Sequence, residues 1–586
     1  MLRLALALLL ASAPVARAAP SAAADARFKA IYEQEWAWRQ KQRGEAGEDE
    51  DFSRVRDRMP KVDAGTQAER RAKLAATLKA LDGLDPRTLS PAQAENYAVY
   101  RAQLQVLINQ QRFREWEKPL TGDSAFWSDV AGVARQPFRR AEDYPAYLAQ
   151  LRDLPRYFDE QIANMRAGLA RGFTPPQVTL QGRDSAIASV AERPPEEVIW
   201  FQPFKTFPAG VSAADHAKWR AEGAAVIRSE VQPAYRRLLA FWRAEYFPEA
   251  RKALDASSLP DGRAYYQSLI AEFTTTAMAP EQIHAFGLSE TAKIRAEMLE
   301  VMKAVGFKGD LPAFLEFLKT DPQFKPKTAD ELMRYAAFIA KEFDGKADRW
   351  FGYLPRKRFA IRPVPDDIAP YYTAARGGPG TYLVNTYDLP SRALYAMPAL
   401  TLHESAPGHA FQMPVAQEQE GLPAFRRRSY ISAFGEGWAL YCERLGDEMG
   451  MYHSPYERFG MLSYQAWRTA RLVVDTGVHA KGWSREQAQA YLRDNTALSD
   501  HEVETEVDRY ISWPGQALSY YLGEDAIRRA RAKAETALGA KFDIRRFHDA
   551  VLKLGSVPLP VLDARIDRWI AEGGPEPYPK SKAAAD

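Results

Sequence analysis

Helical periodicity runs through most of the 586-residue chain and constrains it to a mainly α-helical fold. Apolar residues recur at helical spacing over residues 69–84, 91–113, 142–172 and 213–250. Pro91, directly after Ser90, marks the start of the second segment, and Gly172 ends the third. Strand-like alternation is rare. The sequence therefore predicts an almost wholly helical protein, and its length predicts two to four domains.

The heptapeptide HESAPGH (residues 403–409) is longer by two residues than the zinc-peptidase helix motif H-E-x-x-H. On a straight helix His409 would lie about 600° beyond His403, at roughly 100° per residue, and would point away from it. Pro407 and Gly408 make a straight helix unfavourable, because proline removes a donor and glycine accepts unusual dihedral angles. We therefore predict a break at this pair that turns His409 back towards His403.

The segment SAFGEGWALYCERLGDEMG (residues 432–450) supplies a candidate third ligand. Its apolar stripe predicts an amphipathic helix, and Glu436 lies on another face of that helix, 27 residues after His409. Two histidines and one carboxylate, with an open fourth position, are the composition of a catalytic zinc site. A closed structural site would need cysteines, and the chain has only Cys442. Zinc is the expected metal for these ligands, although cobalt or manganese could replace it in vitro.

Other residues near these segments have simpler expected roles. Glu443 shares a helix face with Glu436 and is expected to be a surface or supporting carboxylate, with metal ligation as the alternative. Cys442 lies off that face and is expected to be a buried core thiol. The histidines expected to be merely packed or exposed are His216, His284, His453, His501 and His548.

Together these motifs resemble the bacterial domain-of-unknown-function 885 family, which is usually grouped with gluzincin-type metallopeptidases. The resemblance rests on GTYLVNT, HESAPGH, EGWALYCE and RYISWPGQALSYYLG, and it is strongest from about Tyr371 to Glu524. EGWA is also similar to the N-E-x-F-A segment that supplies the glutamate ligand in gluzincin aminopeptidases. Relatives often have a further histidine directly after the motif, where this chain has Ala410.

The resemblance implies a helical, gluzincin-like metallopeptidase. It makes His403, His409 and Glu436 the ligands of one Zn²⁺ per chain and Glu404 the general base. Such a base takes a proton from the attacking water and passes it to the leaving amine. The developing oxyanion needs a second donor besides the metal. The candidates for it are Tyr520, which is preferred, Tyr510 and His479, with Tyr521 as a neighbour that could replace Tyr520.

A short strand precedes the motif. Gly377, Gly378, Pro379 and Gly380 mark a turn, and Thr381–Thr386 is rich in β-formers. We expect a small β element near residues 380–386 that forms an edge strand beside the active-site helix, where a peptide substrate pairs with Tyr382 and Val384. Arg509 could bind a peptide carboxylate through its guanidinium group, with an ordinary ion pair as the alternative.

The N-terminus predicts export. Residues 1–18 contain Arg3, a short apolar run and a small-x-small site for cleavage after Ala18, which are typical of a signal peptide. No later apolar run is long enough to span a membrane, and a periplasmic location is expected. Cleavage lowers Lys+Arg from 79 to 77 against 76 acidic residues, a net charge of +1, so a nucleic-acid partner is not expected.

The expected organisation is a signal peptide (residues 1–18), a helical N-terminal region (19–340) and a catalytic zinc-binding region (341–586). The expected function is an exported zinc metallopeptidase acting on short peptides. The alternatives are a zinc hydrolase of an ester or non-peptide amide, and a pseudoenzyme that binds peptide or metal without turnover. The sequence leaves open the oligomeric state, the side-chain preference, and whether cleavage is at either end of the peptide or inside it.

Overall fold

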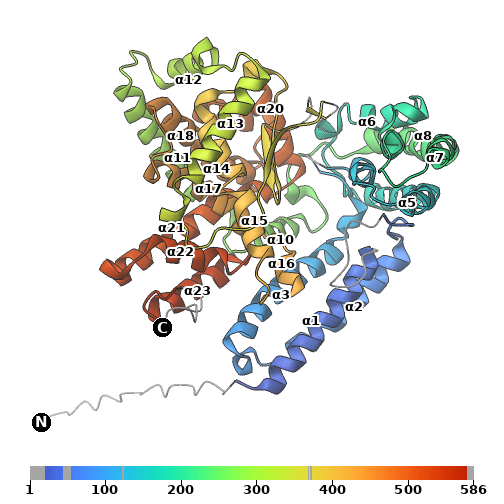
Figure 1. Ribbon diagram of the computed structural model, residues 1–586, viewed down its shortest axis with the longest axis horizontal. Coiled ribbons are helices and arrows are strands. Elements are labelled where there is room, and N and C mark those ends of the chain that lie inside the picture. Colours follow the sequence, from blue (N-terminus) through green and yellow to red (C-terminus); the bar gives the residue numbers. More distant parts are fainter. Residues whose placement is uncertain (1–19, 44–54, 122–123, 367, 370–371, 577–586) are drawn as a thin grey trace, which may run out of the picture.

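The computed structural model describes residues 20–43, 55–121, 124–366, 368–369 and 372–576. The expected signal peptide lies outside these residues. The fold is mainly α-helical with one small sheet, as predicted (Figure 1). The N-terminal helices are α1 (Ala22–Arg43), α2 (Ala64–Asp82) and α3 (Pro91–Phe113), and they form a bundle at one end of the molecule. The predicted helix starting at Pro91 is confirmed.

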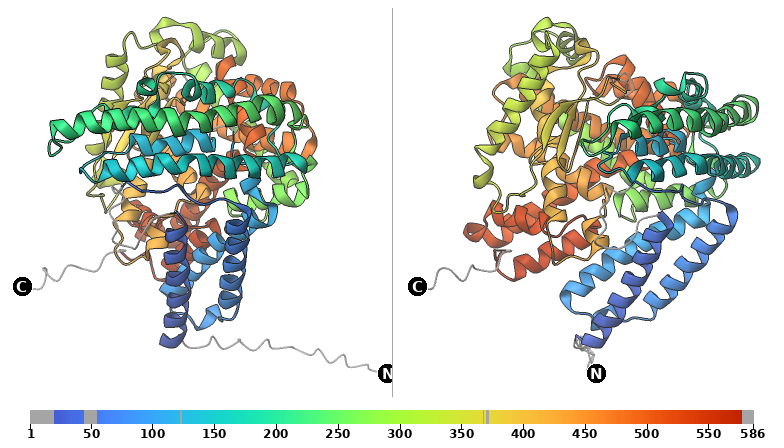
Figure 2. Two further views of the ribbon diagram at one scale, coloured as in Figure 1. Left: turned by 90° about the vertical axis from the view of Figure 1, so that its right-hand side faces the viewer. Right: turned by 45° about the vertical axis from the view of Figure 1, so that its right-hand side comes forward.

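The next part of the chain forms a layer of helices beside this bundle (Figure 2). Its helices are α4 (Phe126–Asp129), α5 (Asp143–Ala170), α6 (Asp184–Ala191), α7 (Ala213–Val226), α8 (Gln232–Phe241) and α9 (Phe247–Glu249). π-Helical turns at Ile227–Val231 and Trp242–Tyr246 join α7, α8 and α9 into one long rod. That rod corresponds to the helical segment predicted for residues 213–250, and α5 packs along it.

The remaining helices surround the candidate site. Four of them precede the sheet: α10 (Gly262–Thr274), α11 (Pro280–Ala304), α12 (Leu311–Thr320) and α13 (Ala329–Asp344). Ten follow it: α14 (Met397–Glu404), α15 (His409–Gln417), α16 (Ala424–Arg427), α17 (Ser432–Glu448), α18 (Pro455–Lys481), α19 (Arg485–Asn495), α20 (Asp500–Ser512), α21 (Ser519–Leu538), α22 (Ile544–Leu552) and α23 (Leu559–Ala571). Within the described ranges, no helix is long and apolar enough to cross a membrane.

Two apolar clusters dominate the core. One combines buried residues of 28–104 with buried residues of 332–569, so the N-terminal bundle packs on the region that carries HESAPGH. The other is confined to residues 59–250. Cys442 is a fully buried free thiol in the first cluster, as predicted. The division near residue 340 stays a prediction.

The sheet corrects one expectation. It contains β1 (Ala360–Pro363), β2 (Ala375–Gly378) and β3 (Thr381–Val384) in the order β1-β3-β2. β3 pairs parallel with β1 and antiparallel with β2, so it is the central strand and not an edge strand. An edge position for residues 380–386 was wrong because β1, which occupies the second side of β3, was not predicted.

Helix packing brings the motifs together. α17 lies along α21, and their contact depends on two glycines. A Cβ on Gly437 would lie 2.4 Å from the backbone carbon of Gly523, and one on Gly523 would lie 1.9 Å from the Ala433 carbonyl oxygen. Since only glycine permits this approach, the two residues fix α21, which carries Tyr520, against α17, which carries Glu436.

Candidate metal centre and catalytic site

The HESAPGH segment is broken where the sequence predicts. α14 ends at Glu404, α15 begins at His409, and residues 405–408 form the turn between the two helices. The turn brings the rings of His403 and His409 to a centroid distance of 4.9 Å, nearly perpendicular to each other. The inserted residues therefore redirect the second histidine towards the first.

Close packing holds this turn. The indole N–H of Trp438 donates to the Pro407 carbonyl oxygen at 2.8 Å, and the Gly408 N–H donates to the Leu402 carbonyl oxygen at 3.0 Å. A Cβ on Gly408 would lie 1.8 Å from the His403 carbonyl oxygen. Glycine is therefore required at this position for steric reasons.

His403, His409 and Glu436 form a grouping suited to a metal ion. One ligand atom from each lies within 4.8 Å of the other two. Glu436 Oε2 is 3.5 Å from His403 Nε2 and 3.3 Å from His409 Nε2. Ligand atoms about 2.0–2.1 Å from a tetrahedral zinc ion lie about 3.3–3.4 Å apart, so the donor set and its spacing fit zinc.

Glu443 supports this trio from behind. Its side chain is fully buried, and its Oε1 lies 2.7 Å from His403 Nδ1. A neutral His403 that donates Nδ1–H to Glu443 presents the lone pair of Nε2 towards Glu436 and His409, which is how carboxylates orient metal-binding histidines. The sequence left open a surface carboxylate, a carboxylate that positions a ligand, or a metal ligand. The buried contact with His403 excludes the surface position and favours the positioning role.

The trio is strongly coupled electrostatically. Burial lowers the pKa of His403, but hydrogen bonds to Glu436 and Glu443 outweigh it and raise that pKa to about 10. Burial raises the pKa of Glu436, but the charge of His409 and the hydrogen bond from His403 bring it well below its usual value. A metal ion bound here would take the place of the proton that His403 holds, so binding would release protons.

We expect Glu443→Gln to weaken zinc binding by about 10- to 100-fold, because it removes the charged acceptor that orients His403. Competition with a chelator measures the zinc Kd. Glu448→Gln on the same helix is the matched control, since Glu448 pairs with Arg531 at the surface. An unchanged Kd for Glu443→Gln would show that Glu443 does not position the ligand.

Glu404 is held by a backbone donor that the sequence did not indicate. The Gly377 N–H of β2 donates to Glu404 Oε2 at 2.6 Å. A Cβ on Gly377 would lie 1.6 Å from the Glu404 carbonyl oxygen, so strand and motif are in direct contact. The glycine-rich turn was interpreted only as a turn, because the sequence does not show which backbone N–H meets the motif.

Tyr520 lies beside the trio. Its ring centroid is 6.4 Å from that of His403, and the two rings are nearly parallel. Tyr521 instead donates its hydroxyl to Glu290 at 2.9 Å. Tyr520 is therefore the better placed of the two for donation to an oxyanion, a role that stays a prediction. Tyr430, which the sequence did not single out, donates its hydroxyl to Glu436 Oε1 at 2.8 Å.

Two arginines of α18 flank Tyr520 and were also missed. The guanidinium carbons of Arg468 and Arg471 lie 5.1 and 4.5 Å from the centroid of its ring. Arg468 is 6% exposed and Arg471 is 1% exposed. Their positions follow from the packing of α18 and α21, which local sequence patterns do not specify.

Two predicted substrate-binding side chains are corrected. Tyr382 and Val384 point into the first apolar cluster and are 0% and 1% exposed. The Tyr382 hydroxyl lies 3.1 Å from the Thr401 hydroxyl. These buried side chains form core contacts and do not face a substrate, and both backbone edges of β3 are already paired with other strands.

His479 and Tyr510 are also corrected, because their polar atoms are occupied within the core. His479 Nδ1 accepts from the Ala256 N–H, and its Nε2–H donates to the Tyr510 carbonyl oxygen. The Tyr510 hydroxyl accepts hydrogen bonds from Trp467 and Arg471. The Tyr510 hydroxyl is also hydrogen-bonded to the Glu506 carboxylate, so its proton is directed there and not to an oxyanion.

The guanidinium group of Arg509 already has partners. It donates to Gln516 Oε1 at 3.0 Å and lies 3.5 Å from Glu506 Oε1. Glu506 also accepts from Arg471 at 2.8 Å. The ion-pair alternative for Arg509 is therefore present, and its binding of a peptide carboxylate stays a prediction.

The neutral His479 has a measurable consequence. Burial lowers its pKa to about 4, whereas an unfolded histidine has a pKa of about 6.5. Between these values the unfolded chain binds a proton that the folded chain does not, so stability falls as the pH falls. We therefore compare the free energy of unfolding of the wild type with that of His479→Gln. As the pH is lowered from 6 to 4.5, we expect the wild-type value minus the variant value to decrease by about 1.4 kcal/mol per pH unit. Urea unfolding of both proteins measures it, and a constant difference would contradict the assignment.

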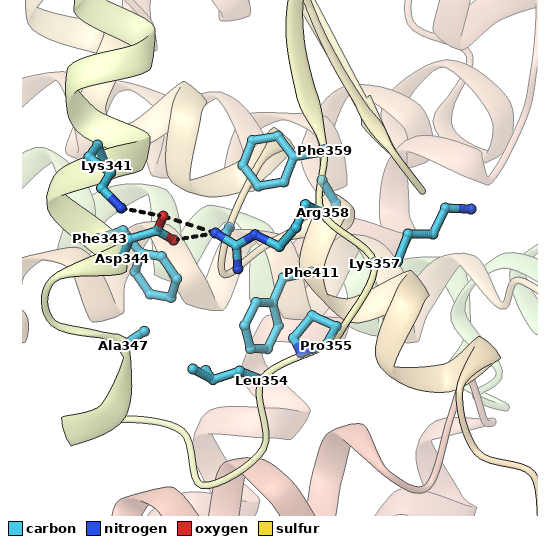
Figure 3. Close-up of a pocket in the computed structure, with 12 residues that line it drawn as sticks. Lys341, Phe343, Asp344, Ala347, Leu354, Pro355, Lys357, Arg358, Phe359 and Phe411 are labelled. Carbon is cyan, nitrogen blue, oxygen red and sulfur yellow. Dashed lines mark hydrogen bonds and ion pairs between the residues drawn. The ribbon is translucent and has the colours of Figure 1, made fainter.

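A separate cavity of about 250 Å³ lies behind the turn of the motif (Figure 3). It is lined by Ala406, by Ala410 and Phe411 of α15, and by residues of α13 and of the loop before β1, among them Phe343. Asp344 pairs there with Lys341 and Arg358. No ligand of the trio lines this cavity, so it is distinct from the candidate catalytic site. Ala410, the residue directly after the motif, lines it.

Comparisons with known proteins agree with this fold. Residues 41–566 match the pattern of the family described as "Bacterial protein of unknown function (DUF885)". The solved structure of a "putative lipoprotein" from Colwellia psychrerythraea has 26% sequence identity to this chain and a TM-score of 0.87. The alignment covers 94% of this chain and 99% of the lipoprotein chain. A "putative lipoprotein of unknown function" from Shewanella oneidensis has 18% identity and a TM-score of 0.63, covering 93% and 99%, and it shows the fold alone. Among curated proteins none matches.

Proposed function

The chain belongs to the DUF885 family of bacterial proteins, and we propose that it is an exported zinc-dependent metallopeptidase that hydrolyses short peptides. The observation that carries this proposal is the meeting of His403, His409 and Glu436 next to Glu404. A closed structural site would not need a carboxylate base beside its ligands, whereas a hydrolytic site does. The grouping with gluzincin-type enzymes is part of the same proposal.

His403, His409 and Glu436 would hold the metal ion, with Glu443 orienting His403. When bound, zinc supplies Lewis-acid polarisation of the scissile carbonyl and acidifies the attacking water. Two neutral imidazoles and one carboxylate leave a dipositive ion with a net positive charge. The two histidines are buried and Glu436 is only partly exposed, so few water molecules screen the charges here and these electrostatic effects are strengthened.

Glu404 performs the proton transfers. Its Oε2 accepts from the Gly377 N–H, which leaves Oε1 to take a proton from the attacking water. The same carboxyl group then gives this proton to the departing amine. The Tyr520 hydroxyl donates to the oxygen that becomes negative as the carbonyl is attacked.

The outer edge of β2 positions the substrate. The Asn385 N–H donates to the Ala374 carbonyl oxygen, so the alternation of an antiparallel pair directs the Gly377 N–H away from β3. That N–H meets Glu404, so the outer edge of β2 faces the catalytic base. An extended peptide adds there as a further strand, which replaces the role first expected for β3.

Export is supported by the N-terminal sequence. Residues 1–18 have the composition of a cleaved signal peptide, and the two similar solved structures are described as putative lipoproteins. We place the mature enzyme in the periplasm, where it acts on short peptides.

The test is incubation of residues 19–586 with a defined mixture of short peptides and zinc, with the products identified by mass spectrometry. We expect cleavage that stops when a chelator removes the metal and returns when zinc is added back. Zinc bound at one ion per chain without cleavage of any peptide would contradict the peptidase proposal. An ester panel then tests the alternative hydrolase, and inactivity on both panels leaves the pseudoenzyme.

A further inference from the structure

Buried, positively charged hydrogen-bond donors stand beside the candidate catalytic site. Arg468 and Arg471 lie three residues apart on α18, so they share a helix face. Within the described residues, Arg468 Nε and Nη1 and Arg471 Nη1 are buried without a hydrogen-bond partner. Leaving charged donors buried and unsatisfied costs more than leaving neutral ones, so the arrangement calls for an anionic acceptor.

The carboxylates of the protein do not supply that acceptor. Glu506 accepts from Arg471 at 2.8 Å, and it also lies next to Arg509. The guanidinium groups of Arg471 and Arg509 therefore share this one carboxylate. Burial and the charge of Arg471 lower the pKa of Arg468, and Glu443 and Tyr520 act in the opposite direction. Glu443 Oε1 already bonds to His403, and within the described residues Glu443 Oε2 makes no hydrogen bond, so it does not accept from Arg468.

Aromatic rings keep Arg468 in place without satisfying its N–H groups. Its guanidinium carbon lies 3.9 Å from the centroid of the Trp467 ring and 5.4 Å from that of Tyr464. Stacking of this kind orients the planar fork and leaves its edge for a bidentate partner. The same carbon lies 5.1 Å from the centroid of the Tyr520 ring, which is stacked towards His403.

We propose that Arg468, with Arg471 beside it, binds the C-terminal carboxylate of the peptide substrate, so that the enzyme removes short units from the carboxyl end. This inference rests on the proposed peptidase function. Both guanidinium groups and the His403 ring lie against the same aromatic ring, that of Tyr520. Since an extended residue spans about 3.3–3.6 Å, a carboxylate held there lies roughly one to three residues beyond the scissile bond.

The test compares three versions of one short peptide: a free acid, its C-terminal amide, and an amide whose last residue is glutamate. We expect wild type to prefer the free acid over the plain amide by about 100-fold in kcat/KM, mainly through KM, as a buried charged pair implies. Preference for the glutamate amide over the free acid would assign the carboxylate to a side chain and overturn the C-terminal assignment. Equal cleavage of all three would overturn the subsite itself.

Arg468→Met keeps the apolar stem and removes the charge. We expect its ratio of free-acid to amide kcat/KM to fall close to one, with partial recovery in Arg468→Lys. Arg426→Met is the matched control, because Arg426 is also buried but bonds to Asn96 and the Leu554 carbonyl oxygen. A ratio measured on each variant does not depend on how much of the sample is folded. An unchanged ratio in Arg468→Met would overturn the proposal.

A binding experiment separates failure of this inference from failure of the peptidase proposal. Calorimetric titration of the zinc-loaded protein with N-acetylalanine and with N-acetylalaninamide needs no turnover. We expect the acid to bind more tightly than the amide in wild type but not in Arg468→Met, which retains all metal ligands. Equal binding of the acid by both proteins would place it at the metal or elsewhere and overturn the subsite, even if peptides are cleaved.

Discussion

Glu404→Gln is expected to lower kcat for peptide hydrolysis by about 10³-fold or more while zinc remains bound. The amide has nearly the shape of the carboxylate but cannot accept a proton from water. Glu404 is not one of the three ligand residues, so their spacing should persist. The measurement is kcat with a short peptide that the wild type cleaves, together with the zinc content of the same samples.

Glu420→Gln provides the matched control, because this exposed glutamate follows α15 and touches neither the metal ligands nor Glu404. We expect it to match the wild type. Equal kcat in Glu404→Gln and wild type would show that another group is the base, and the mechanism would then be wrong.

His409→Ala is expected to weaken zinc binding by well over 100-fold, because it removes one of the three metal-binding side chains. Loss of a residue that only orients a ligand typically costs up to roughly 100-fold. Zinc at 100 times its Kd stabilises the folded state by about 2.7 kcal/mol. We therefore expect zinc to raise the Tm of the wild type and to leave the Tm of His409→Ala unchanged.

His453→Ala is the control for loss of a histidine, since His453 is exposed and pairs with Glu342. Its Tm should rise with zinc as that of the wild type does. If His409→Ala kept the zinc-dependent rise, His409 would not be a ligand, and the interpretation of the motif would fail.

The local part of the site could be predicted from the sequence. The break in HESAPGH is predictable from its own residues. Pro407 and Gly408 disfavour a continuous helix at the place where the motif has two residues more than H-E-x-x-H. Glu436 could be placed on a helix face by periodicity alone. These inferences needed only residues close together in the chain, or the spacing of one helix.

What could not be predicted depends on contacts between distant segments. Gly377 reaches Glu404 across 27 residues, and Arg468 reaches Tyr520 through the packing of α18 and α21. The central position of β3 depends on β1, a four-residue strand with no strong sequence signal. Strand pairing is set by tertiary context more than by local preference, so an edge strand and a central strand look alike in sequence.

The measurement that tests the central claim most directly is a titration of zinc into the metal-free mature protein while peptide cleavage is followed. The account predicts no cleavage without zinc, a rate that rises in proportion to zinc, and a plateau at one ion per chain. Full activity in the metal-free protein, or one tightly bound zinc per chain with no cleavage of any peptide, would contradict the assignment of His403, His409 and Glu436 to a catalytic zinc centre.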